Sequence, residues 1–149
     1  MIFFKFIIAF SLMLSINACQ QKRDVNINAN SEKPPGNVQR IAMVTGLKPE
    51  KLAYYKQLHA DAWPAVQKKI TECNIKNYSI YLKEINGQLL LFSYFEYAGV
   101  NFDEDMKRMA ADTTTQRWWK ETDPCQQPLP DAAAKKQIWS NMQELFHQD

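Results

Sequence analysis

Short apolar, β-rich runs form the first pattern along this chain. One run covers Arg40 to Leu47, and two others cover Tyr78 to Leu82 and Leu89 to Tyr97. Runs of this length and composition predict strands. Asn86-Gly87 separates the last two runs and is the strongest short hairpin signal in the sequence, so these two strands are predicted to pair antiparallel.

Helical spacing occupies the segments between these strands. Apolar side chains recur at three and four residues from Lys51 to about Cys73, which predicts a helix there. Pro64 falls inside this segment and is predicted to kink or break the helix just after Trp63. Asn101 is a suitable N-cap for a second predicted helix, which begins directly after it.

The C-terminal third completes the predicted order of elements. Thr122 to Ala134 holds three prolines and no periodicity, which predicts a loop, and Trp139 to Phe146 is predicted to be a last strand. The order βαββαβ is that of an α+β, ferredoxin-like fold. Its helices cover one face of the sheet, and the very apolar third strand leaves the other face in need of cover. A second copy of the chain, in a symmetric homodimer, is the simplest cover.

Composition narrows the class of protein. The chain has 149 residues, of which 46% are apolar and 23% charged, as expected for one globular domain. A dispersed net charge of +2 argues against a nucleic-acid partner. The sequence has no glycine-rich phosphate loop, no nucleophile elbow and no metal-ligand motif, so neither a metal nor a cofactor is predicted.

The first 18 residues have the build of a lipoprotein signal peptide. An apolar run follows Lys5, and Ile16-Asn17-Ala18-Cys19 resembles the lipobox of bacterial lipoproteins, in which the cysteine becomes the lipidated N-terminus. A cleaved signal with a chance cysteine is the alternative. Residues 19–39 are polar and are predicted to be a flexible tether, which leaves residues 40–149 as the folded domain. These features predict an exported lipoprotein, anchored by its lipid to the outer membrane and facing the periplasm of a Gram-negative bacterium.

Two cysteines, Cys73 and Cys125, lie in the predicted folded domain. An even pair in an oxidising compartment is compatible with a disulfide, but the sequence leaves open whether the two sulfur atoms can meet.

The candidate chemistry lies in the segment from Tyr55 to Pro64. Tyr55, His59 and Trp63 are four residues apart and would share one face of a helix. Histidine exchanges protons near neutral pH, and aromatic rings with polar tips suit a sugar. Read with Tyr78 and the pair Trp118-Trp119, the segment predicts a sugar site. A lone histidine on such a helix is more often a structural residue, and His147 near the C-terminus is interpreted that way.

Several motifs, taken in order, resemble the L-rhamnose mutarotase family. They are Arg40 to Val44, the Tyr-x-x-x-His-x-x-x-Trp-Pro segment from Tyr55 to Pro64, Asn77 to Leu82, Gln116-Arg117-Trp118-Trp119, and Glu144 to His147. The resemblance covers essentially the whole predicted domain. It implies a dimeric α/β-barrel enzyme that interconverts the α and β anomers of a sugar without a cofactor. By the same resemblance His59 is the catalytic proton donor, and Tyr55, Tyr78, Trp118 and Trp119 bind the substrate.

The chain departs from the family pattern in two places. Typical members are cytoplasmic and have no leader segment, and the piece from Ala98 to Asp105 looks like an addition that leads toward Trp118-Trp119. The addition bears on the choice of sugar, so L-rhamnose or a related 6-deoxyhexose is the predicted substrate. An L-fucose mutarotase and a non-catalytic sugar-binding lipoprotein remain alternatives.

Overall fold

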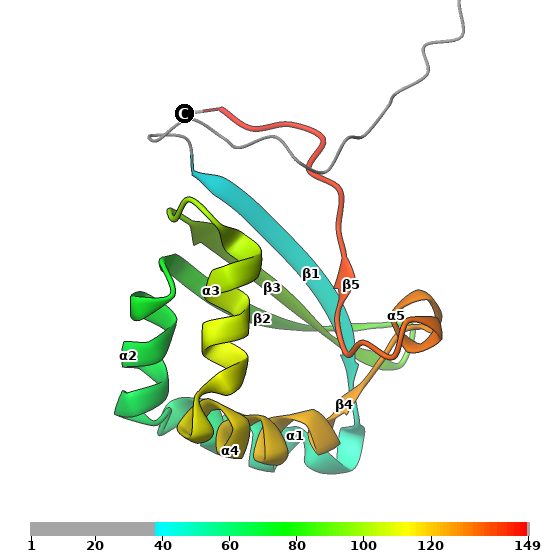
Figure 1. Cartoon of the computed structure of the whole chain (residues 1–149). Coiled ribbons are helices and arrows are strands. Elements are labelled where there is room, and N and C mark those ends of the chain that lie inside the picture. The colour runs from blue at the N-terminus through cyan, green and yellow to red at the C-terminus, as the bar shows by residue number, and fades with distance from the viewer. Residues whose placement is uncertain (1–37, 149) are drawn as a thin grey trace, which may run out of the picture. The chain divides into compact units, whose positions relative to one another are not determined.

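One antiparallel sheet organises the protein, whose structure, a computed structural model, describes residues 38–148 (Figure 1). The predicted signal peptide, Cys19 and all but the last two residues of the predicted tether lie outside the described residues. The main strand order is β2-β3-β1-β4, and β5 also pairs with β1. This mixed α/β architecture confirms the predicted ferredoxin-like fold. The strands are β1 (Gln39–Leu47), β2 (Ile75–Ile85), β3 (Gln88–Tyr97), β4 (Gln126–Gln127) and β5 (Ser140–Asn141).

The predicted hairpin joins β2 to β3. Asn86 and Gly87 have φ angles of 51° and 76°, both in the left-handed region. Two such residues in succession give the turn whose twist matches paired strands, and Ile85 pairs with Gln88 across it. The local sequence therefore fixes the register of the central hairpin.

An irregularity in β2 sets the direction of Tyr78. The register with β3 shifts between Lys76 and Ser79, and Asn77 inside this bulge has a φ of 50°. Side chains alternate along a strand, so Ile75 and Tyr78 would point to opposite faces without an extra residue. The bulge puts both on the face that the helices cover.

Helices α1 to α4 pack on one face of the sheet (Figure 1). The predicted single helix from Lys51 to Cys73 is in fact two. α1 ends at Ala60, three residues before the predicted break, and Pro64 opens α2 rather than bending a continuous helix. Trp63 is extended (φ −64°, ψ 126°), as the residue before a proline prefers. The helices are α1 (Leu52–Ala60), α2 (Pro64–Glu72), α3 (Phe102–Ala111), α4 (Thr113–Thr122) and α5 (Pro130–Ala134), with short turns η1 (Pro49–Lys51) and η2 (Asp123–Cys125).

The C-terminal third differs most from its prediction. The predicted loop from Thr122 to Ala134 contains η2, β4 and α5, and the predicted last strand is only the two residues of β5. β4 and β5 pair with the same edge of β1, each through only two residues. Gly46 makes the β4 pairing possible, since a Cβ at this position would lie 2.6 Å from the carbonyl oxygen of Gln127.

Two apolar clusters fill the space between sheet and helices. One joins Leu47, Tyr55, Leu91 and Cys125, and the other joins Cys73, Ile75, Phe95 and Met109. The two cysteines therefore lie in different clusters, and both are buried and free. The open possibility of a disulfide is thus not realised in this structure.

Candidate active site

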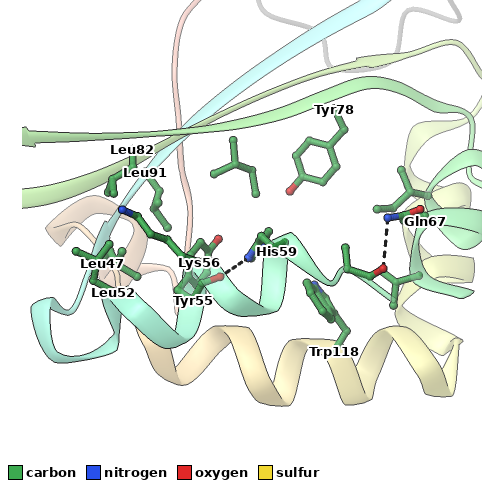
Figure 2. Close-up of a pocket in the computed structure, with 15 residues that line it drawn as sticks. Leu47, Leu52, Tyr55, Lys56, His59, Gln67, Tyr78, Leu82, Leu91 and Trp118 are labelled. Carbon is green, nitrogen blue, oxygen red and sulfur yellow. Dashed lines mark hydrogen bonds between the residues drawn. The ribbon is translucent and has the colours of Figure 1, made fainter. Parts of the chain in front are cut away.

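His59 stands at the centre of an aromatic group that comes from two helices. The rings of Tyr55 and His59, one turn apart on α1, have centroids 4.2 Å apart. The indole of Trp118, from α4, meets His59 edge-on at 5.3 Å. Figure 2 shows Tyr78 reaching from the sheet toward these helices with its hydroxyl leading. Of the three residues predicted to share one helix face, only Tyr55 and His59 do, because Trp63 lies beyond the end of α1. Residues far away in sequence complete the group.

The hydrogen bond of His59 fixes which ring nitrogen is available. Nδ1 lies 2.9 Å from the backbone carbonyl oxygen of Tyr55. A carbonyl oxygen only accepts, so Nδ1 carries the proton and donates it. In the neutral imidazole, Nε2 is then an unprotonated base. Burial lowers the pKa of His59 below its ordinary 6.5 and outweighs the opposing effect of this hydrogen bond, so the neutral form dominates at pH 7.

The two tyrosine hydroxyls are kept protonated. Tyr55 is only 4% exposed, and burial is the main cause that raises its pKa. Tyr78 is 41% exposed as a whole residue, but its hydroxyl end is the part that enters the interior, and burial raises its pKa as well. Near neutral pH both groups therefore offer a hydrogen-bond donor beside a neutral histidine.

Two cavities of about 680 and 750 Å³ meet at His59. Either volume lies in the range of small-molecule sites. The first cavity continues along an apolar wall with Lys56 at its side, and the second continues past Trp119 and Asp123. The residues that line both are Tyr55, His59, Val66, Ile70, Tyr78, Ile80 and Trp118.

The structure brings together every predicted site residue that it describes. His59, Tyr55, Tyr78 and Trp118 line both cavities, and Trp119 lines the second. Trp63 lies behind the site, with its ring centroid 5.4 Å from that of Trp118. Trp63 lines neither cavity, so it can shape the site only through Trp118.

Polar residues of the cavity walls that sequence reasoning missed include Lys56, Asp123 and Gln126. One signal was present for Asp123, which follows Trp119 by four residues and so shares its helical face. The segment after Thr122 was interpreted as a loop, which hid this spacing.

A neutral histidine, protonated tyrosines and aromatic walls define an acid–base enzyme for a small neutral ligand. Comparison with known proteins identifies the kind. The family described as L-rhamnose mutarotase matches residues 40–148, and the chain belongs to this family. It is therefore an enzyme of the isomerase class.

Individual relatives agree with the family match. A protein named L-rhamnose mutarotase from Bacillus subtilis is 29% identical over 112 residues, which are 75% of this chain and the whole of that protein. One of the same name from Phocaeicola vulgatus is 28% identical over 113 residues, with the same coverage. The crystal structure of an L-rhamnose mutarotase from Formosa agariphila has the same fold, with a TM-score of 0.54, 21% identity, and coverage of 74% of this chain and 99% of that one.

The comparisons correct one prediction. The location at the outer membrane, as an exported lipoprotein, is wrong, because these relatives are matched over their whole length by the domain and have no counterpart of the leader. Among residues 38–148 the structure contains no helix of the length and apolarity that a membrane crossing requires.

Proposed function

We propose that residues 40–149 form a catalytic domain that interconverts the α and β anomers of L-rhamnose, with His59 as the group that moves the proton. The observation that carries this proposal is the 2.9 Å hydrogen bond from Nδ1 of His59 to the Tyr55 carbonyl, which presents Nε2 to an aromatic cavity. The names of the relatives, L-rhamnose mutarotase throughout, supply the substrate. They favour L-rhamnose over the L-fucose alternative and over a binding protein without activity.

The reaction moves one proton from the anomeric hydroxyl to the ring oxygen. Nε2 of neutral His59 takes the proton of the anomeric hydroxyl, the C1–O1 bond becomes a carbonyl, and the bond from C1 to the ring oxygen breaks. The ring oxygen leaves with the electron pair and receives the proton from the imidazolium. Rotation about C1–C2 turns the aldehyde over, and the reverse steps close the ring on its other face. His59 ends neutral, as it began.

The remaining residues position the sugar. The hydroxyls of Tyr55 and Tyr78 donate hydrogen bonds to sugar oxygens, because their raised pKa values keep them protonated. Trp118 and Trp119 cover the C–H side of the ring. The first cavity carries an apolar wall that suits the methyl group of a 6-deoxysugar, formed by Leu47, Leu52, Ile80, Leu82 and Leu91.

Exchange spectroscopy tests the proposal directly. Saturation-transfer NMR follows α/β exchange of L-rhamnose with the whole chain, with L-fucose measured beside it. His59→Asn keeps a donor for the Tyr55 carbonyl but removes the base, so enzyme-dependent exchange should fall by about 10²- to 10⁴-fold. His147→Asn is the matched control and should exchange at the wild-type rate, since His147 is exposed and lines neither cavity. Full activity in His59→Asn would refute the assigned role.

We further propose that the chain is a homodimer through the outer face of its sheet. Phe92 faces away from the helices, because it alternates with the buried Leu91 and Ser93. Its cross-strand neighbours are Val44 and Tyr81, so an apolar row crosses three strands. Tyr81 is 63% exposed in the single chain, an unusual state for a large aromatic side chain in a sheet.

Sedimentation equilibrium tests this interface. The whole chain should have twice its monomer mass, and Phe92→Glu should shift it toward the monomer, because a carboxylate would be buried without a partner. Val100→Glu places the same charge on an exposed loop residue and should leave the mass unchanged. A wild-type monomer at high concentration would refute the dimer.

A further inference from the structure

The second cavity has a carboxylate in its wall that the proposed mechanism does not use. α4 ends at Thr122, but the backbone N–H of Asp123 still donates to the carbonyl of Trp119, so the helical geometry continues for one more residue. Side chains three and four apart share a helix face. Trp119, Thr122 and Asp123 therefore all line this cavity together with Trp118.

Asp123 has no protein partner for its side chain. Within residues 38–148 its carboxylate makes no hydrogen bond and no ion pair, whereas Asp105, the buried carboxylate of α3, is held by Asn74 and Arg108. Burial alone raises its pKa above the ordinary 3.8. The residue as a whole is exposed, so its carboxylate is open to a ligand that enters the cavity, and a ligand with donor groups would satisfy it.

Its neighbours show what kind of ligand fits. The charge of Asp123 is one of the causes that raise the pKa of Tyr55. The carboxylate therefore lies near enough to the predicted substrate-binding hydroxyl for the two to contact one ligand. Oε1 of Gln126, on the same cavity wall, is a buried acceptor to which no group of residues 38–148 donates. Trp119 adds an aromatic face that is 36% exposed. Two acceptors beside an aromatic face suit a neutral ligand rich in O–H donors.

We propose that Asp123 binds hydroxyl groups of the sugar away from the anomeric carbon and so helps to determine which sugar the site accepts. A carboxylate only accepts hydrogen bonds and has two oxygens, so it can hold two neighbouring ring hydroxyls at once. The inference rests on the proposed function for the identity of the ligand, but it concerns recognition and not proton transfer. Asp123 is thus a specificity residue beside a histidine that performs the chemistry.

Kinetics of Asp123→Asn test the role. The variant keeps the shape and one acceptor oxygen but loses the charge. A lost hydrogen bond to a charged group predicts a rise in KM for L-rhamnose of about 10-fold or more, with kcat within about threefold of wild type. Glu121→Gln is the matched control, because it removes a carboxylate of the same helix that binds Tyr54 at 2.5 Å and lines neither cavity. A fall in kcat at unchanged KM would place Asp123 in proton transfer and overturn the proposal, as would kinetics equal to wild type.

A series of deoxysugars identifies the contacted hydroxyls. Equilibrium binding of 2-, 3- and 4-deoxy analogues of L-rhamnose is measured for wild type and for Asp123→Asn. An analogue that lacks a contacted hydroxyl should bind wild type more weakly than L-rhamnose does. Its affinity should also fall less than that of L-rhamnose when Asp123 is replaced by Asn, as a double-mutant cycle requires for interacting groups. The same loss for every analogue would overturn the proposal.

The binding measurements also separate the proposed role of Asp123 from the proposed mutarotase function. If wild type binds L-rhamnose without exchanging its anomers, the proposed function fails, while the deoxysugar series still decides the role of Asp123. Near-UV circular dichroism of each variant confirms that the fold is intact.

Discussion

Asp105 and Asp123 are two carboxylates in the same layer of helices with opposite surroundings. Asp105 is 8% exposed and accepts hydrogen bonds from Nδ2 of Asn74 and from the hydroxyl of Tyr97, both at 2.7 Å. Arg108 adds an ion pair at 2.7 Å. Burial alone would raise the pKa of Asp105, but these three partners outweigh it and hold the pKa below the ordinary 3.8. The pKa of Asp123, with no such partner, lies above that value.

The difference separates structure from function inside one fold. A buried polar group whose partners are all supplied by the protein fastens elements together, here α3 to the ends of β2 and β3. A solvent-accessible carboxylate in a cavity wall that no protein group holds is instead available to a ligand. By this criterion the Asp105 cluster is a structural joint, and the wall around Asp123 is the part of the cavity where we propose that a ligand binds.

The adjacent residues Trp118 and Trp119 differ in the same way, one packed inside the protein and the other facing the cavity. Substitution of this pair should show the largest effect on stability. Trp118 is 8% exposed and packs on His59 and Trp63, so Trp118→Ala should lower the free energy of unfolding by about 3 kcal/mol. Trp119 is 36% exposed, and Trp119→Ala should cost about 1 kcal/mol or less. Its effect should appear instead as a roughly tenfold higher KM, because a stacking surface is lost.

Urea denaturation and anomer-exchange kinetics measure both variants. The control is Tyr94→Phe, which keeps a half-buried aromatic ring that lines neither cavity. Equal losses of stability for Trp118→Ala and Trp119→Ala would break the contrast between a packed and a ligand-facing tryptophan.

The sequence predicted the regular part of the fold well, for local reasons. Asn86-Gly87 supplied the turn, and Asn101 caps α3 by accepting a hydrogen bond from the N–H of Glu104 at 3.2 Å. The break between α1 and α2 was misplaced because Pro64 forbids a helical residue before it but also favours a new helix after it.

Features that depend on distant partners could not be predicted. β4 and β5 each pair with only two residues of β1, and no local pattern records such short pairings. The site shows the same division. Motif resemblance located His59 and its aromatic neighbours, whereas the pairing of Asp105 and the isolation of Asp123 depend on which side chains tertiary packing brings near each carboxylate.

A substitution at the structural joint should cost less than the loss of Trp118 and leave catalysis intact. Asp105→Asn removes the charge that Asn74, Tyr97 and Arg108 surround, so the free energy of unfolding at pH 7 should fall by about 2 kcal/mol. The pKa of Tyr97, raised to about 12 by burial and by Asp105, should also move down. Urea denaturation and ultraviolet titration measure these changes. KM and kcat should stay within about twofold of wild type, since Asp105 lines neither cavity.

Acid should change the stability effects of the two carboxylates in opposite directions. The folded pKa of Asp105 is lowered, so its contribution is complete above the ordinary value of 3.8 and is lost as the pH falls through the lower folded pKa. The stability gap between wild type and Asp105→Asn should therefore shrink as the pH falls below 3.8. The folded pKa of Asp123 is raised, so its charge opposes folding at neutral pH and acid relieves this. Asp123→Asn should be slightly more stable than wild type at pH 7 and lose that advantage as the pH falls through the raised pKa and below 3.8. Urea denaturation from pH 7 to pH 3 measures both gaps, and slopes of the same sign would show that the two carboxylates do not differ as described.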